Sequence, residues 1–319
     1  IHFIMNQNDI KIVEDRINPK YEKLPGEFIY KNSNWGLWSS LDIIKKIENE
    51  FVFYPDDVLI ATYPKSGTTV LQQIVWLIMN NVDVGQAKSR SVIKRCPFID
   101  ENLEHDFDFY KGFIVNGGPL IPRPRLMKTH LAFQNLENQI NKNPEMKILV
   151  TIRNPKDNAV SMFHFYKGVS DYGPFEGSWD DFFERWIDGW ISGGDWLDVT
   201  TAWWNVRFRK NIKIVFFEDL IFKKKEVIRD LCEFLNKNLT ECQIDQIVEH
   251  TEFRAMKSNP GVNYNLMPGS QWWFRNNFQF MRKGEVGDWK NYFTEEQSKR
   301  LDAKNNRVLE ECGLKFRYE

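Results

Sequence analysis

The chain has 319 residues, of which 42% are hydrophobic and 15% aromatic, and its formal net charge is -1. A chain of this length buries a substantial core, and we expect a single domain over residues 1–319, because α/β proteins of this size often form one. The near-neutral charge argues against a nucleic-acid-binding surface, so basic residues that bind an anion must be gathered locally.

The cysteines form no CxxC pair and no metal-ligand cluster, which favours a reduced, cytoplasmic protein without a metal site. No apolar run approaches the length of a membrane span, so no membrane partner is expected. The first fourteen residues mix charges into their hydrophobics and do not suit a signal peptide. Because the chain begins with Ile, the sequence leaves open whether a segment precedes residue 1.

The first fifty residues predict little regular structure before one helix. Residues 1–35 contain Pro19, Pro25 and Gly26 and are expected to form an irregular lead-in. Ser39 or Ser40 then precedes isoleucines that share one helical face, which predicts a capped amphipathic helix.

Residues 57–76 predict a strand, a tight turn and a helix in immediate succession. Gly67, in the turn, permits a backbone twist that other residues resist, so amide groups and the helix N-terminus can point into one small space that suits an anion. Lys65 adds a positive charge. Further donors for phosphate oxygens come from three hydroxyls, those of Ser66, Thr68 and Thr69.

This turn does not match the strict phosphate-loop pattern, because Lys65 precedes Gly67. A plain strand-to-helix turn with a capping threonine is therefore an alternative. Beyond the helix, residues 81–125 lose clear periodicity and gather glycines and prolines, which predicts long loops that form a pocket wall or lid.

Two further short strands are predicted to end on basic or titratable residues. Residues 126–130 place Lys128 and His130 on the same face, although a lone histidine is usually structural. Residues 147–153 form a firmer apolar strand that ends on Arg153. Pro155 suits the first turn of the helix that follows, with Ser161 two turns into it.

The rest of the chain alternates predicted helices with one more strand, at residues 212–217. Predicted helices span 178–190, 196–209, 222–234, 240–250 and 294–312, and capping pairs open three of them: Ser178 with Asp181, Thr240 with Gln243, and Thr294 with Gln297. Strands that alternate with helices predict an α/β fold with a mostly parallel central sheet and helices on both faces.

The last informative run is residues 280–290, where Arg282 and Lys283 precede Gly284 and a second glycine follows at 287. The glycines would let the backbone approach a ligand closely. The alternative is a solvated turn.

Four motifs, in this order, resemble those of the cytosolic sulfotransferase family over about residues 35–316. They are Tyr-Pro-Lys-Ser-Gly-Thr-Thr at 63–69, Lys-Thr-His at 128–130, Arg-Asn-Pro-Lys-Asp-Asn-Ala-Val-Ser at 153–161 and Arg-Lys-Gly-x-x-Gly-Asp-Trp at 282–289. The resemblance implies a P-loop-like α/β fold. It also implies binding of 3′-phosphoadenosine 5′-phosphosulfate (PAPS) and transfer of its sulfonate to a small-molecule hydroxyl or amine, without a metal and with the desulfated nucleotide PAP as product.

The resemblance also implies roles for individual residues. It gives His130 the role of general base, with Lys65 and Lys128 stabilising charge on the sulfonate. It implies a 5′-phosphosulfate site at Lys65, Ser66, Gly67, Thr68 and Thr69. It implies a 3′-phosphate site at Arg153, Ser161, Arg282, Lys283 and Gly284, next to Met281. It places Thr251 and Phe253 at the adenine and lines the acceptor pocket with Phe98, Met162 and Phe165.

The chain departs from the family pattern at several positions. Val70 replaces a Trp that commonly stacks on the adenine, so stacking falls to Phe253. The family's dimer motif is changed at Glu295 and Lys299, which predicts a monomer or a weak homodimer. An acidic loop could attract a cationic amine or could simply be solvated: Asp100, Glu101, Glu104, Asp106 and Asp108.

Three alternatives to a cytosolic sulfotransferase stay open. A non-catalytic nucleotide-binding protein would keep the anion sites without the chemistry, but Lys128-Thr129-His130 argues against it. A relative that uses sulfonation to drive dehydration of an alcohol would release a dehydrated product. A Golgi sulfotransferase is disfavoured by the cytosolic-type motifs, although Asn238-Leu-Thr240 is a glycosylation sequon.

Overall fold

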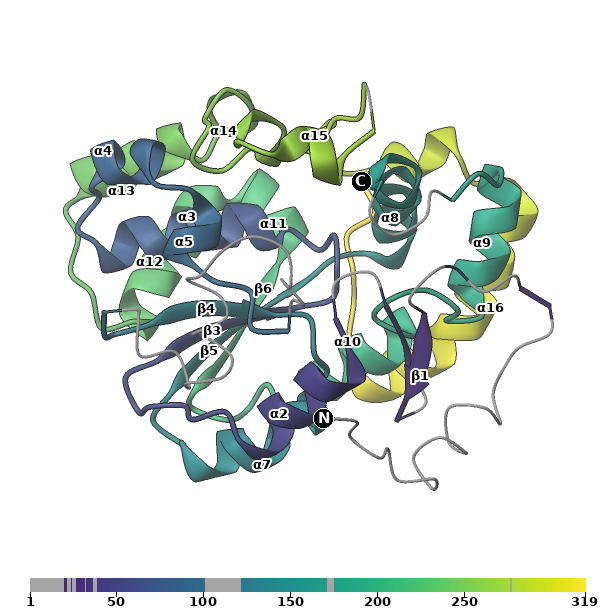
Figure 1. Ribbon diagram of the computed structural model, residues 1–319, viewed down its shortest axis with the longest axis horizontal. Coiled ribbons are helices and arrows are strands. Elements are labelled where there is room, and N and C mark those ends of the chain that lie inside the picture. Colours follow the sequence, from purple (N-terminus) through teal and green to yellow (C-terminus); the bar gives the residue numbers. More distant parts are fainter. Residues whose placement is uncertain are drawn as a thin grey trace, which may run out of the picture.

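The structure is a computed structural model that describes residues 20–21, 24, 27–31, 33–36, 39–100, 122–170, 175–275 and 277–319. At its centre lies a four-stranded sheet in the order β4-β3-β5-β6, and all its strands run parallel (Figure 1). The strands are β3 (Val58–Thr62), β4 (Leu126–Thr129), β5 (Lys147–Ile152) and β6 (Ile212–Phe216). The predicted parallel α/β fold is confirmed.

The central strand β3 is buried along its whole length and separates two apolar cores. Val58 and Ile60 pack into a core with helices α3 (Thr68–Met79), α12 (Lys224–Phe234) and α13 (Glu241–His250). Leu59 and Ala61 face the opposite core. Helices α2 (Leu41–Asn49), α7 (Phe133–Lys142), α9 (Trp179–Ile187) and α10 (Trp196–Asn205) pack there. Figure 1 shows α3, α12 and α13 on one side of the sheet and α2 and α7 on the other.

Other helical elements lie along the described chain. The longer helices are α8 (Pro155–Gly168) and α16 (Glu295–Cys312), and the short helical segments are α14 (Phe253–Lys257), α15 (Ser270–Trp273), η1 (Tyr264–Leu266) and η2 (Asp288–Asn291). All three predicted capping boxes are present, and Ser40 caps α2 by accepting from Ile43 N–H. Short-range side-chain chemistry therefore sets where these helices begin.

Several element predictions were wrong. The predicted loops at 81–125 contain α4 (Val84–Ser89) and α5 (Val92–Arg95), and residues 101–121 lie outside the described chain. The predicted irregular lead-in contains an antiparallel pair, β1 (Phe28–Tyr30) and β2 (Ser33–Trp35). Helix α11 (Phe217–Phe222) follows β6 directly and was not predicted. These elements are too short for periodicity to show, and packing stabilises them.

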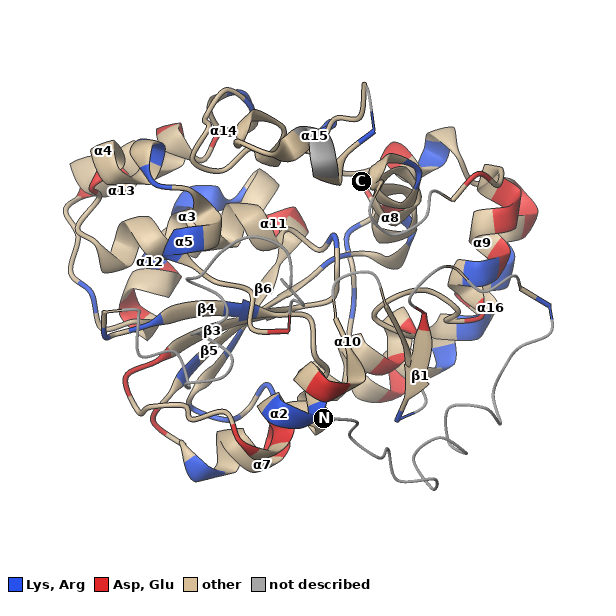
Figure 2. Ribbon diagram, viewed as in Figure 1, with Lys and Arg blue, Asp and Glu red and all other residues tan. Residues whose placement is uncertain are grey.

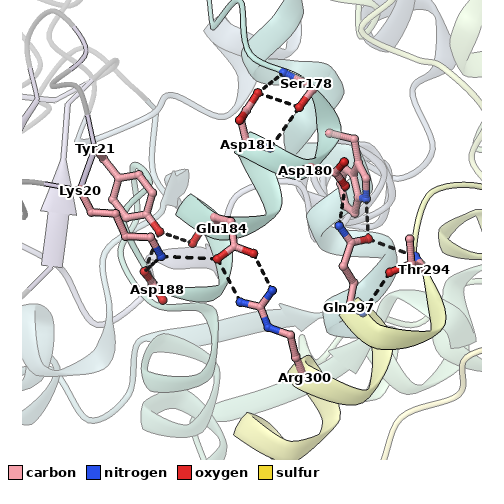
Figure 3. A network of polar contacts seen from close by, with 11 residues as sticks. Lys20, Tyr21, Ser178, Asp180, Asp181, Glu184, Asp188, Thr294, Gln297 and Arg300 are labelled. Atoms are coloured by element: carbon pink, nitrogen blue, oxygen red, sulfur yellow. Dashed lines mark hydrogen bonds and ion pairs between the residues drawn. The ribbon is translucent and has the colours of Figure 1, made fainter.

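Acidic and basic residues are interspersed over the ribbon, and α9 begins with two aspartates (Figure 2). A polar network joins this helix to α16 and to the segment at Lys20 (Figure 3). Arg300 donates to both carboxylate oxygens of Glu184, at 2.6 and 3.0 Å, and Gln297 donates to Asp180 at 2.7 Å. The N-terminus of α16 is thereby fixed to the body of the protein.

A buried ion pair supports the start of β3. Arg125 Nε donates to Asp57 Oδ1 at 2.9 Å, and the two side chains are 1% and 0% exposed. Replacing Arg125 by methionine should lower the free energy of unfolding by about 3–5 kcal/mol, because Asp57 would stay buried without its partner. Denaturant titration measures this change.

The neighbouring pair Arg123 and Asp56 provides a matched control, because both of its side chains are more than two-fifths exposed. Arg123→Met should leave the free energy of unfolding nearly unchanged. Equal losses in the two variants would show that burial does not set the contribution of the Arg125 pair.

Candidate functional site

The loop at residues 63–67 joins β3 to α3 and has a backbone that requires glycine at position 67. Gly67 has φ of 101°, and an added Cβ would lie 2.6 Å from Phe217 Cδ2. Lys65 also has a positive φ, of 65°. The loop therefore turns sharply into the N-terminus of α3, where backbone N–H groups have no partner within the helix.

A side chain of α8 fixes this loop from the side. Asn158 Nδ2 donates to the Pro64 carbonyl at 2.9 Å and to Ser66 Oγ at 3.0 Å. Asn158 lies in the motif at residues 153–161, but nothing in that motif indicated this contact. Its neighbours on the same helical face are Ser161 and Phe165, so Ser161 lies on the side of α8 that meets the loop.

Lys65 projects into a cationic cluster, defined here as Lys65, Lys128, Arg153 and Arg282. Its Nζ lies 4.7 Å from the ring centroid of Phe165 and 4.3 Å from that of Phe280. Burial lowers the pKa of Lys65 to about 7, and repulsion by the other three cations adds to the decrease. The cations predicted from separate motifs are thus close enough to repel one another.

Arg153 joins the loop at 63–67 to the run at 282–289. Its Nη1 donates to the Lys65 carbonyl at 3.2 Å and its Nη2 to the Glu285 carbonyl at 3.3 Å. The guanidinium also lies 4.2 Å from the ring centroid of Phe217, while its buried Nε has no hydrogen-bond partner among the described residues. No carboxylate in that part of the chain forms an ion pair with Arg153, so the guanidinium keeps binding capacity for an anion.

The run at 282–289 is held by two aspartates that the sequence did not single out. Asp288 forms ion pairs with Arg282, at 2.5 Å, and with Lys283. Burial raises the pKa of Asp288, but hydrogen bonds from Lys283, Asn291 and Arg282 outweigh it and lower the pKa to about 2. Asp157 of α8 accepts from Gly287 N–H at 2.8 Å and so ties this run to the helix.

The residues expected around an adenine lie beside that run. Gly284 has φ of 69°, and a Cβ there would lie 2.3 Å from Cδ2 of Phe253, so the backbone packs closely on this ring. Met281 is buried in the same small apolar cluster that Phe253 contacts. The hydroxyl of Thr251 donates to the Ile247 carbonyl at 2.7 Å, so it also serves to end α13.

His130 follows β4 and is buried against the end of β3. Its Nδ1 lies 2.7 Å from the Thr62 carbonyl oxygen. Because a carbonyl only accepts, Nδ1 carries the hydrogen, and Nε2 of the neutral ring is the basic nitrogen. Burial, with the charges of Lys128 and Lys65, lowers the pKa of His130 to about 3, so the ring is neutral near pH 7.

Asp100 follows Phe98, which pairs with Lys128 of β4, and does not lie in a solvated acidic loop as predicted. Its carboxylate is fully buried and accepts from His130 N–H at 3.0 Å, and burial raises its pKa to about 7. Asp100 is therefore neither a solvated charge nor an open amine site. The other four acidic residues of this loop lie outside the described chain.

Aromatic side chains flank His130 and Lys65. The Phe98 ring centroid lies 4.8 Å from that of His130 and 4.1 Å from Lys128 Nζ. Phe165 contacts Lys65 as described above, whereas Met162 is wholly buried in the core. Two of the three predicted pocket residues thus lie beside the basic and titratable groups.

The arrangement suits a ligand with more than one anionic group. The glycine at position 67, the unpaired Nε of Arg153 and the lowered pKa of Lys65 each indicate a site that an anion would stabilise. Over the residues that the structure describes, no group of three His, Cys, Asp or Glu side chains is placed to hold a metal ion. Within that part of the chain, no helix is both long and apolar enough to cross a membrane.

Comparisons with known structures show the same fold elsewhere. A crystal structure of mouse sulfotransferase SULT7A1 complexed with PAP is 25% identical, with a TM-score of 0.69, and covers 89% of this chain and 94% of that one. The crystal structure of retinol dehydratase with retinol and PAP is 24% identical, with a TM-score of 0.77, and covers 98% and 97% of the two chains. At that identity the second comparison shows the fold alone.

Comparisons of sequence show the family. Sulfotransferase 1 family member D1 of Mus musculus is 36% identical over 285 residues, or 88% of this chain and 92% of the relative. Sulfotransferase 1C2 of Rattus norvegicus is 39% identical over 262 residues, 82% and 86% of the two chains. Residues 55–313 match the family model described as "Sulfotransferase domain". The chain therefore belongs to the cytosolic sulfotransferase family.

Proposed function

We propose that this sulfotransferase moves the sulfonate of PAPS to a hydroxyl, or an amine, of a small and largely apolar acceptor, with His130 as general base. The observation that carries the proposal is the contact between Arg153 and both proposed anion-binding segments. The Arg153 guanidinium donates to the backbone carbonyl of Lys65 in one segment and to that of Glu285 in the other. Two cationic segments that are distant in the chain thereby contact the same side chain. PAPS has anionic groups at both ends.

The two ends of the site suit the two ends of that nucleotide. The 5′-phosphosulfate would lie at the N-terminus of α3, with backbone N–H groups and three hydroxyls as donors. The 3′-phosphate would be held by Arg153, Arg282 and Lys283, with Ser161 and Gly284 at its border. The adenine would lie against Phe253, near Thr251 and Met281. This division of roles is the one that the resemblance to the family implies, and the cations of each segment support it.

The same residues account for the chemistry. Bound PAPS supplies an activated sulfonate. Nε2 of His130 takes the proton of the acceptor hydroxyl, since Nδ1 already carries a hydrogen held by Thr62. Lys65 and Lys128 stabilise negative charge around the transferred group, and they need no proton transfer to do so. Phe98 and Phe165 give the acceptor side apolar walls that exclude water.

A transfer assay tests the proposal directly. The chain is incubated with labelled PAPS and a panel of phenols, steroids, other alcohols and amines, and products are identified by mass spectrometry. Gain of one sulfonate by an apolar acceptor is the expected result. Loss of water from an alcohol would instead support the dehydratase alternative, and PAP binding without any product would support a non-catalytic nucleotide-binding protein.

Protonation of Lys65 provides a second, independent prediction. Its pKa of about 7 means that Lys65 loses its proton above that pH in the free protein. A neighbouring phosphate favours the charged form and raises this pKa, so PAP binding at about pH 8 should take up protons. Calorimetry in two buffers of different ionisation enthalpy measures the uptake. Lys65→Met should abolish it, and an unchanged uptake in that variant would exclude Lys65 as the source.

We infer a cytoplasmic, single-domain enzyme that is a monomer or a weak homodimer. In the region of the altered dimer motif, Lys299 pairs with Glu295 at 2.5 Å in its own helix, and Lys290 pairs with Glu319. The side chains of Lys299, Glu295 and Lys290 are therefore already paired within the chain. Light scattering over a range of concentrations tests this inference. A stable dimer that dissociates when Thr294 is mutated would contradict it.

A further inference from the structure

The hydroxyl of Thr62 lies between the imidazole of His130 and the first residue of α3. Thr62 Oγ1 is 3.1 Å from His130 Nδ1 and 2.7 Å from Thr68 Oγ1, and all three side chains are buried. Thr62 ends β3 and Thr68 begins α3, so the loop at 63–67 closes between them. The two hydroxyls form a continuous row from the imidazole to the helix N-terminus.

The Thr62 carbonyl fixes the first hydrogen of this row. That oxygen accepts the Nδ1 hydrogen at 2.7 Å, and Thr62 Oγ1 lies close enough to share the same hydrogen. Either hydroxyl can donate in the contact between Thr62 Oγ1 and Thr68 Oγ1; when Thr62 donates, the hydrogens run in one direction along the row. The hydrogen of Thr68 is then directed onward, to whatever anion lies at the start of α3.

We propose that Thr62 is a positioning residue that couples protonation of His130 to the anion held at the N-terminus of α3. This inference rests on the proposed sulfotransferase function. His130 takes up the acceptor proton at Nε2 as the acceptor oxygen bonds to sulfur, and the electron pair of the breaking S–O bond stays on the phosphate oxygen of PAP. The charged ring is a stronger donor to Thr62, which polarises Thr68 toward that new negative charge.

A neighbouring threonine shows that such a contact is not general in this sheet. Thr151 of β5 is paired with Thr62 across the sheet and is equally buried, but within the described chain its Oγ1 has no hydrogen-bond partner. The two positions thus have the same residue, strand environment and burial, and they differ in what the hydroxyl contacts. They form a matched pair for substitution.

The test compares Thr62→Val, Thr62→Ser and Thr151→Val in the full chain. We expect Thr62→Val to lower kcat about five- to tenfold, on the scale of one buried hydrogen bond, while PAP affinity measured by calorimetry changes little. Thr62→Ser should recover most of the loss, and Thr151→Val should behave as the unchanged chain. A kcat equal to that of the unchanged chain in Thr62→Val would overturn the proposal.

Nuclear magnetic resonance of histidine-labelled protein gives a readout besides activity. The chain has five histidines, and His130→Ala identifies the signal of interest. Addition of PAP should shift the His130 Nδ1–H resonance in the unchanged chain and in Thr62→Ser, and the shift should shrink in Thr62→Val. An equal shift in all variants would overturn the coupling. Failure of the unchanged chain to bind PAP would instead overturn the proposed function.

Discussion

Replacing His130 by alanine is expected to lower kcat by about 10²–10⁴-fold, the usual contribution of a general base. The structure gives the reason: Nδ1 is held by the Thr62 carbonyl at 2.7 Å, and the lowered pKa keeps Nε2 unprotonated near pH 7. Alanine leaves the acceptor proton with no side-chain base at this position. Steady-state turnover with saturating PAPS and acceptor measures the effect.

The loss should be confined to turnover, because the Thr62 carbonyl holds the imidazole at the end of β3 and His130 is not one of the predicted phosphate ligands. PAP affinity of His130→Ala, measured by calorimetry, should therefore stay close to that of the unchanged chain. His250→Ala, at the end of α13, is a matched control that should keep normal turnover. Full turnover in His130→Ala with PAP bound normally would remove the proposed mechanism.

Replacing Arg153 by alanine should weaken PAP binding by about 10²–10³-fold, the scale for loss of a buried, charge-assisted contact. Arg153 is 8% exposed and bridges the Lys65 and Glu285 carbonyls, so its loss removes both a cation and the contact between two segments. Arg153→Lys should recover only part of the affinity, because an ammonium cannot span two carbonyls and a phosphate as a planar guanidinium does.

Calorimetric titration with PAP measures both variants, and the unfolding midpoint checks that each is folded. Arg209→Ala provides a control on general loss of positive charge, since Arg209 donates to Asn141 at the surface. If Arg153→Ala bound PAP as tightly as the unchanged chain, PAP binding would not depend on Arg153 or on its contact with the 282–289 run. An affinity of Arg153→Lys equal to that of the unchanged chain would show that the guanidinium geometry contributes nothing.

Local sequence patterns predicted the parts of the site that depend on one segment. Gly67 and Gly284 were expected to allow unusual backbone, and both have positive φ. The order of strands and helices predicted a parallel sheet, and ends of parallel strands lie at one edge. Arg153 and His130 each follow the end of such a strand, at the same edge as the loop at 63–67.

Contacts between segments were not predictable in the same way. Asn158 supports Ser66, Asp157 ties down Gly287, and Asp100 binds the His130 backbone, yet none of these pairs is close in the sequence. Polar residues of this kind are usually solvated, and only the fold decides which are buried. For Asp100, the composition of its loop indicated solvent exposure, whereas pairing of the preceding segment with β4 buries the side chain.

Two cationic segments are proposed to bind opposite ends of one nucleotide beside His130, and a crystal structure of the chain with PAP would show whether they do. We expect one PAP molecule with its 5′-phosphate at residues 65–69 and its 3′-phosphate at Arg153, Arg282 and Lys283. A nucleotide bound elsewhere, or one whose 3′-phosphate does not contact these cations, would contradict it.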